Sequence, residues 1–205
     1  EQAASQAETL RLKKQLLDVL GELKKARQEA DQAQTTLGQA EVFSQAGFTD
    51  ILLANLAVTS PKIARLASLA RQARMTVAVD AAGNVRDLSG AATAAGVTLN
   101  VVVAISAGPD RFGAQPGEGA VNLARAVADS DGLGFAGLMA SEGAILEDDP
   151  DRLAARTRER LQPILDTREL AEKAGLRVGA VIAGGSYNLE VVATMDGVTE
   201  VPAGR

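Results

Sequence analysis

The residue types that usually carry out chemistry are sparse in this chain of 205 residues. Histidine and cysteine are both absent, which removes the commonest general base near neutral pH, thiolate nucleophiles, disulfides and thiolate metal ligands. A reaction would therefore have to use lysine, arginine, carboxylates, the single tyrosine or a cofactor. All lysines fall within predicted helices, so none is expected at a strand end where it could form a Schiff base. The lysines are Lys13, Lys14, Lys24, Lys25, Lys62 and Lys173.

Two short segments have residue types that could bind ions. The Gly184-Gly185-Ser186 turn would let the backbone approach an anion, although most such sequences are simple turns. The carboxylates of Glu147-Asp148-Asp149 and Asp151 could hold a hard cation. They precede a predicted helix, however, where acidic residues are common, so we predict a helix cap and no metal site. Glu142 and Glu200 could form an acid/base pair, at a separation that the sequence does not define.

These residues are connected by helices that alternate with short apolar runs from Leu37 onward. The centres of the runs are separated by roughly 20–45 residues, a spacing typical of strand–helix units in parallel sheets. The predicted strands are 50–55, 75–80, 98–105, 135–140, 178–183 and 198–201, and the predicted helices include 37–47, one from Ser60, 84–95, 117–128 and 150–174. Such units form either an open doubly wound sheet or a closed barrel, with ligands at the carboxyl ends of the strands.

Residues 1–36 have a different composition and are predicted to be a separate amphipathic, coiled-coil-like helix. Apolar residues recur at alternating steps of four and three over 12–37, the heptad pattern of a coiled coil. Three roles agree with this pattern: packing on the remainder of the chain, self-association, or replacement of native sequence in a chimera. We therefore divide the chain into the helix 1–36 and an α/β domain over 37–205.

Composition restricts the class of protein further. A net charge of −5 argues against nucleic-acid binding, and no apolar run approaches the length of a membrane span. No signal-peptide pattern opens the chain, so the cytoplasm is the default expectation. The absence of His, Cys, Trp and an initiating Met indicates either a trimmed, engineered or designed chain or an alanine-rich natural one.

The strand ends, taken in order, resemble the D-threonine aldolase and D-3-hydroxyaspartate dehydratase family. These are pyridoxal-phosphate enzymes of fold type III, related to alanine racemase. The resemblance covers about residues 36–205 and implies an incomplete or remodelled parallel (β/α) barrel of about six strands. The matching segments include Gly47-Phe-Thr-Asp-Ile-Leu-Leu-Ala-Asn55, Val77-Ala-Val-Asp80, Gly108-Pro-Asp-Arg-Phe-Gly113, Ser141-Glu-Gly143 and Ala183-Gly-Gly-Ser186.

The resemblance implies a cofactor site made of Arg111, Gly184, Gly185, Ser186 and Tyr187. In the family, the glycine-rich turn holds the cofactor phosphate, and the arginine lies near the pyridine nitrogen, where a cation keeps that nitrogen unprotonated. Because of the departures described next, we expect binding of pyridoxal phosphate to be weak or absent.

Several chemical positions depart from the family pattern. The family's Schiff-base lysine lies on a first strand whose place is taken here by the heptad helix, and Ala144 and Ser141 replace a histidine and a tyrosine beside Glu142. We therefore predict no catalytic residue and interpret the chain as a non-catalytic scaffold version of the barrel. The alternatives are a pyridoxal-phosphate-dependent lyase or dehydratase acting on D-3-hydroxy amino acids, and an interaction module that self-associates through the helix 12–37.

Overall fold

A computed structural model describes residues 37–108, 111–143, 145 and 147–202. The predicted heptad helix and the boundary of the 1–36 segment therefore lie outside the described residues. Helices and strands alternate along the chain, as the apolar runs predict. The elements are α2 (Leu37–Gln45), β1 (Asp50–Leu56), α3 (Ser60–Leu69), β2 (Arg74–Val79), α4 (Ala82–Ala95), β3 (Leu99–Ser106), α5 (Glu118–Ala128), β4 (Leu133–Ser141), α6 (Pro150–Lys173), β5 (Ala180–Ile182) and α7 (Leu189–Val192).

The strands form one parallel sheet in the order β1-β2-β3-β4-β5. Each strand pairs with the next strand along the chain, so all five carboxyl ends lie at one edge. This order and the intervening helices confirm the predicted α/β fold of an incomplete parallel barrel. The predicted sixth strand over 198–201 is corrected, because it is reduced to a single bridge between Ile182 and Glu200.

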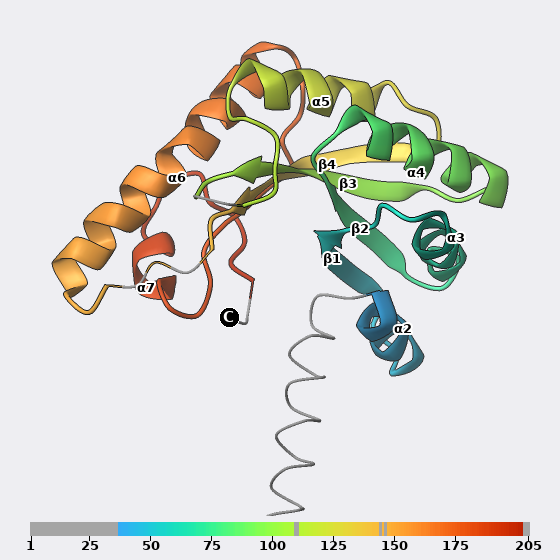
Figure 1. Cartoon of the computed structure of the whole chain (residues 1–205), viewed down its shortest axis with the longest axis horizontal. Coiled ribbons are helices and arrows are strands. Elements are labelled where there is room, and N and C mark those ends of the chain that lie inside the picture. The colour runs from blue at the N-terminus through green and yellow to red at the C-terminus, as the bar shows by residue number, and fades with distance from the viewer. Residues whose placement is uncertain (1–36, 109–110, 144, 146, 203–205) are drawn as a thin grey trace, which may run out of the picture.

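The helices cover one face of the sheet, and Figure 1 shows α3, α4, α5 and α6 in an arc around the strands. The core beneath them is aliphatic, as a chain with 2% aromatic residues requires. Leu66, Leu88, Ile105, Leu138 and Leu161 are completely buried there. Burial of such side chains stabilises the fold by about 1.5–3 kcal/mol each.

The opposite face of the sheet carries smaller side chains. Ala78, Val102 and Ala104 are completely buried on it, together with Met139 and Ile182. Phe112 and the β1 residues Leu52, Ala54 and Leu56 pack against this second cluster. The alternation of β3 residues between the two clusters is that expected of a strand buried on both sides.

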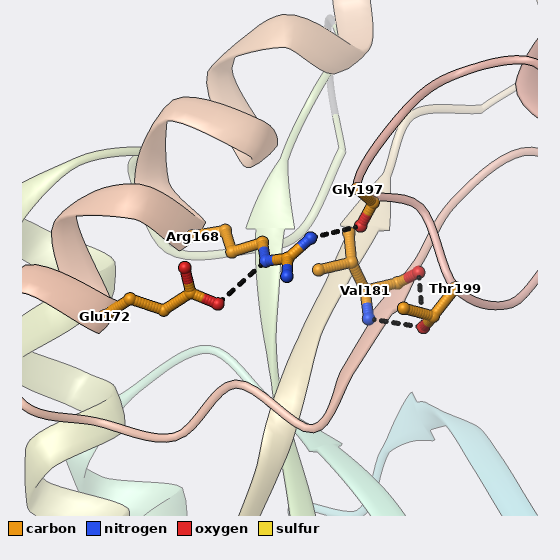
Figure 2. A network of polar contacts seen from close by, with 5 residues as sticks. All are labelled: Arg168, Glu172, Val181, Gly197 and Thr199. Carbon is orange, nitrogen blue, oxygen red and sulfur yellow. Dashed lines mark hydrogen bonds and ion pairs between the residues drawn. The ribbon is translucent and has the colours of Figure 1, made fainter.

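The segment after α7 is fastened to β5 and α6 (Figure 2). Arg168 of α6 donates one hydrogen bond to Glu172, at 2.9 Å, and another to the Gly197 carbonyl, at 3.0 Å. The Val181 N–H donates to the Thr199 hydroxyl at 2.9 Å. These contacts hold residues 197–200 beside β5, in the position of the next strand.

The ends of two helices show how the sequence sets the element boundaries. The Asp149 carboxylate accepts a hydrogen bond from the Arg152 N–H at 2.9 Å, which confirms the cap predicted before α6. At α3 the cap residue is Thr59 and not Ser60, since Ser60 already has helical geometry ahead of Pro61. Within the described part of the chain, no helix is long and apolar enough to cross a membrane.

Candidate functional site

The carboxyl edge of β3, β4 and β5 brings together residues that are far apart in the sequence. Glu142 directly follows β4, and Tyr187 lies in the turn after β5. The two side chains meet with the Tyr187 hydroxyl 2.8 Å from Glu142 Oε1. The same hydroxyl lies 2.7 Å from the Gly143 carbonyl oxygen. The loops after two neighbouring strands are therefore joined through one phenol group.

The hydrogen count at this phenol constrains the protonation of Glu142. A tyrosine hydroxyl has one proton, and here it faces two oxygen acceptors at hydrogen-bond distance. An ionised Glu142 would leave one of these short oxygen–oxygen contacts without a proton. A protonated Glu142 satisfies both, because its carboxyl donates to Tyr187 while Tyr187 donates to the Gly143 carbonyl. The geometry thus favours the neutral acid.

The surroundings of Glu142 act in the same direction. Its side chain is only 6% exposed, and burial raises the pKa of Glu142 because a carboxylate loses its hydration there. Tyr187, Asn188, the Gly184 N–H and the Arg160 guanidinium oppose this rise, since each favours the charged form. Burial has the larger effect, so the net change in pKa is upward.

Tyr187 is held as a neutral phenol. Burial raises the pKa of Tyr187, and the charge of Glu142 and the hydrogen bond to it raise it further. Arg160 and Arg111 act against this rise, which places both cations close enough to influence the phenol. Tyr187 is the single tyrosine of a chain without tryptophan, so its absorbance and fluorescence report on this cluster.

Two glycines let the loop carrying Arg111 lie against Glu142. A Cβ on Gly108 would fall well inside van der Waals contact with the Glu142 carbonyl oxygen. Gly143, at φ 66°, lies beneath the Arg111 side chain, whose Cδ would be 3.2 Å from a Cβ at that position. The Arg111 guanidinium also lies 5.6 Å from the ring of Phe112, although its side chain is exposed.

Gly108→Ala is expected to destabilise the protein by about 1–2 kcal/mol, because the added methyl group pushes the loop away from a backbone carbonyl. The fluorescence of Tyr187 should change with it, since the two loops meet at that residue. Urea unfolding followed by circular dichroism measures the first effect. Gly90→Ala is the control, because Gly90 lies in α4 with no atom within 4 Å of a new Cβ; that change should stabilise by about 0.5–1 kcal/mol. Equal unfolding free energies for wild type and Gly108→Ala would contradict the close approach.

The Gly184-Gly185-Ser186 turn adjoins the cluster but uses part of its backbone internally. The Gly185 N–H donates to Asn188 Oδ1 at 2.9 Å. Gly184 has φ 83°, and a Cβ there would lie 2.8 Å from the Val192 side chain. The turn is therefore tight for packing reasons, and α7, which follows it, has only four residues and a small dipole. Ser186 is the exposed residue of this turn, so it is the one that a phosphate in solvent would meet first.

Two of the lysines, Lys62 and Lys173, lie in the described part of the chain, and both are on helices, as predicted. Lys173 lies on α6 and pairs with Glu169 at 3.3 Å on the exposed side of that helix. Lys62 lies on α3, as predicted, yet its side chain lines a hollow of about 330 Å³ with Asn55 and Phe112, beyond the carboxyl end of β1. Both described lysines therefore lie on helices, and Lys62 is the one that lines the hollow at the end of β1. Neither lysine contacts Glu142 or Tyr187.

The carboxylates considered for a metal or for paired acid/base chemistry have other contacts. Glu147 forms an ion pair with Arg156 at 3.4 Å, and Asp149 caps α6. Over the described ranges, no group of three or more metal-ligating side chains is close enough to hold an ion. Glu200 is exposed on its bridge to Ile182, so the residue that contacts Glu142 is Tyr187.

Sequence reasoning missed two residues of the cluster, Asn188 and Arg160. Asn188 is 2% exposed and its Nδ2 has no hydrogen bond of normal geometry to the described residues, although the amide faces Glu142. Arg160 donates a long hydrogen bond, at 3.4 Å, to the Glu142 carbonyl oxygen. Asn188 comes directly after Tyr187 and could have been found there. Arg160 is one of several arginines on α6, and its sequence position does not distinguish it.

Comparison with known proteins identifies relatives of this chain. The family model described as "Alanine racemase, N-terminal domain" matches residues 15–204. The chain is 30% identical over 169 residues to the D-threonine aldolase of an Arthrobacter species, covering 82% of this chain and 45% of that protein. It is 35% identical over 159 residues to the 3-hydroxy-D-aspartate aldolase of Paracoccus denitrificans strain Pd 1222, covering 75% of this chain and 41% of that protein.

A solved structure gives the same result. The D-threonine aldolase from Filomicrobium marinum superimposes with a TM-score of 0.80 at 37% identity, over 83% of this chain and 46% of that one. The chain thus spans less than half the length of these relatives. The predicted resemblance to pyridoxal-phosphate enzymes of fold type III is confirmed, and this chain belongs to the alanine racemase N-terminal domain family.

Proposed function

We propose that the described part of this chain binds pyridoxal phosphate without forming a covalent bond to it, and so is a non-catalytic version of a lyase barrel. The observation that supports binding is the cluster of Arg111, Glu142 and Tyr187 at the carboxyl edge of the sheet, next to the Gly184–Ser186 turn. The observation that supports non-covalent binding is the position of Lys62 and Lys173, neither of which contacts this cluster.

The residues present fit the two ends of the cofactor to different degrees. Arg111 presents an exposed cation over Gly143, whose carbonyl oxygen lies 2.7 Å from the Tyr187 hydroxyl, and such a cation suits a pyridine nitrogen that accepts a hydrogen bond. At the turn, the Gly185 N–H is already engaged with Asn188, so the phosphate contact would depend on Ser186. When bound, the cofactor supplies an electron sink for carbanions formed at a substrate α-carbon. The side chains here would bind it, orient its ring and keep the phenol proton in place.

A second function is suggested by the names of the relatives. They are aldolases for D-threonine and 3-hydroxy-D-aspartate, so a lyase or dehydratase acting on D-3-hydroxy amino acids is the alternative. That alternative requires a lysine that forms an imine with the cofactor. Its specific support in this structure is Lys62, whose side chain lines the hollow at the end of β1.

Pyridoxal phosphate and pyridoxine phosphate should bind with similar affinity, because the second compound keeps the ring and the phosphate but lacks the aldehyde. Quenching of Tyr187 fluorescence measures both. Arg111→Ala should weaken each about tenfold, the loss of roughly one charge-assisted hydrogen bond. Arg125→Ala on α5 is the control, since the side-chain hydrogen bond that Arg125 makes within the described residues goes to Asn122 on its own helix.

Borohydride reduction and mass spectrometry separate the two functions. After addition of one equivalent of pyridoxal phosphate, the non-covalent site predicts no stoichiometric adduct on a single lysine. A reducible adduct on one lysine, together with failure of pyridoxine phosphate to bind, would contradict the proposal and support the lyase.

A further inference from the structure

A second hollow lies between the carboxyl end of β3 and the middle of α6. Its volume is about 430 Å³, and Ser106, Arg156, Glu159 and Arg160 supply its polar lining. Ser106 is the last residue of β3, and the other three occupy about one turn of α6. None of the residues expected to hold pyridoxal phosphate lines this hollow.

Most of the N–H donors of Arg160 have no hydrogen-bond acceptor among the described residues. A guanidinium carries five N–H donors. Within the described residues, Arg160 makes a single hydrogen bond, the 3.4 Å contact with the Glu142 carbonyl, and no ion pair. Its side chain is half-buried, so water satisfies it incompletely. A cation in this position favours an anionic ligand that can accept two parallel hydrogen bonds.

The remaining charges restrict what that ligand can be. Arg156, one turn before Arg160, is paired with Glu147 at 3.4 Å, so part of its charge is offset by that carboxylate. Glu159 is exposed beside Arg160 and makes no ion pair with the described residues. Among the described residues, the hollow is therefore lined by one cation and one anion without an ion pair, at successive positions of α6. A phosphate or sulfate, with two negative charges, would be repelled by Glu159, whereas a zwitterion would meet both charges favourably.

We propose that this hollow binds the head group of a free α-amino acid, with the carboxylate on Arg160 and the ammonium on Glu159. The Ser106 hydroxyl also lines the hollow and donates to the Arg111 carbonyl oxygen at 3.4 Å. The volume accommodates an amino acid with a small side chain. The site needs no pyridoxal phosphate, so it does not rest on the function proposed above. It places an amino acid next to Glu142, whose carbonyl oxygen already contacts Arg160.

Calorimetric titration of the full chain with glycine, acetate and methylamine tests the proposal in the absence of pyridoxal phosphate. Glycine should bind saturably, more tightly than acetate, and methylamine most weakly. Arg160→Gln should weaken glycine binding at least tenfold, and Arg160→Lys should give an intermediate loss because it keeps the charge without the planar pair of donors. Glu159→Gln should remove the preference for glycine over acetate. Arg158→Gln, an exposed neighbour that does not line the hollow, is the matched control.

Three results would overturn the amino-acid site: no saturable glycine binding, unchanged glycine binding in both Arg160 variants, or an equal loss in Arg158→Gln. Sulfate binding more tightly than glycine would also reject it and indicate a simple anion site. Arg111→Ala should leave glycine binding unchanged while it weakens pyridoxal phosphate, so failure of one site is distinguishable from failure of the other. Unfolding temperatures of the Arg160 variants, measured by circular dichroism, establish that they fold.

Discussion

Gly137→Ala should destabilise the protein by about 4 kcal/mol, because the new methyl group would occupy the position of the β5 backbone. Gly137 pairs with Ala180 in the parallel ladder between β4 and β5. A Cβ on Gly137 would fall inside van der Waals contact with the Ala180 carbonyl oxygen and within 2.8 Å of the Ala180 N and carbonyl C. All three atoms are backbone, so no side-chain rotation relieves the contact.

The expected result is loss of β5 pairing together with the contacts that β5 supports. β5 has three residues, and the segment at Thr199 is attached to it through Val181. Urea unfolding followed by circular dichroism should show a lower midpoint, and Tyr187 fluorescence should change at urea concentrations below the main transition. The second effect follows because the turn that carries Tyr187 begins directly after β5.

Gly134→Ala is the matched control for Gly137→Ala, since it makes the same change on the same strand. A Cβ on Gly134 would lie 3.5 Å from Asn100 Oδ1, an ordinary contact with a side chain. Its effect should be within about 0.5 kcal/mol of zero. If the two variants have the same stability, the close approach of β4 and β5 is wrong.

The fold was predictable from the sequence to the extent that burial controls it. The run over 98–105 is apolar at every position but Thr98 and Asn100, and it forms the central strand β3 (Leu99–Ser106). The helix predicted over 84–95 ends at Ala95, and Gly96 caps it at φ 65°, as the glycine in the sequence allows. In both cases the signal lies in consecutive residues, so no knowledge of distant neighbours was required.

The prediction of a sixth strand over 198–201 was wrong for a local reason that the pattern of apolar residues does not show. Gly197, at φ 98°, turns the chain just before the segment, and Pro202 just after it has no N–H to donate. The N–H groups of Thr199 and Glu200 both go to the Val181 carbonyl oxygen, so the ladder cannot extend. Residues 198–201 are therefore adjacent to β5 while forming only one bridge with Ile182.

The candidate site was less predictable, because its contacts join residues that are distant in sequence. Glu142 and Tyr187 were each selected from the sequence, yet their contact spans 45 positions. The sequence shows that residue 108 is a glycine, but not that its missing Cβ makes room for the Glu142 carbonyl. The position of the Arg160 guanidinium depends on the rotation of α6 against β4, which helical periodicity alone does not fix.

The pH dependence of stability should identify Glu142 as a neutral acid. The pKa of Glu142 is raised in the folded state, so the folded protein binds the carboxyl proton more tightly than the unfolded chain does. This contribution to stability is fully present below the unfolded pKa, about 4.5, and is lost as the pH rises through the folded pKa. Each unit of difference between the two pKa values corresponds to about 1.4 kcal/mol.

Glu142→Gln and Glu142→Ala separate the proton from the packing. The glutamine amide can donate to Tyr187 while Tyr187 donates to the Gly143 carbonyl, so this variant should match wild type at pH 4 and exceed its stability at pH 8. Glu142→Ala leaves the Tyr187 hydroxyl without its carboxyl partner and creates a void, at a cost of about 2–3 kcal/mol at both pH values. Glu200→Gln is the control, because it makes the same substitution at an exposed glutamate outside the cluster.

Absorbance of Tyr187 follows the phenol proton and so gives an independent measurement of the charge on Glu142. The phenol should ionise only as the protein unfolds at alkaline pH, because the pKa of Tyr187 in the folded state is raised above its ordinary value of 10.0. In Glu142→Gln the carboxylate charge is gone, so ionisation of the folded protein should begin at lower pH than in wild type. A Glu142→Gln protein whose stability falls with pH as steeply as wild type would show that the slope arises elsewhere. Glu142 would then be a carboxylate, and the Tyr187 proton would serve only one of its two neighbouring oxygens.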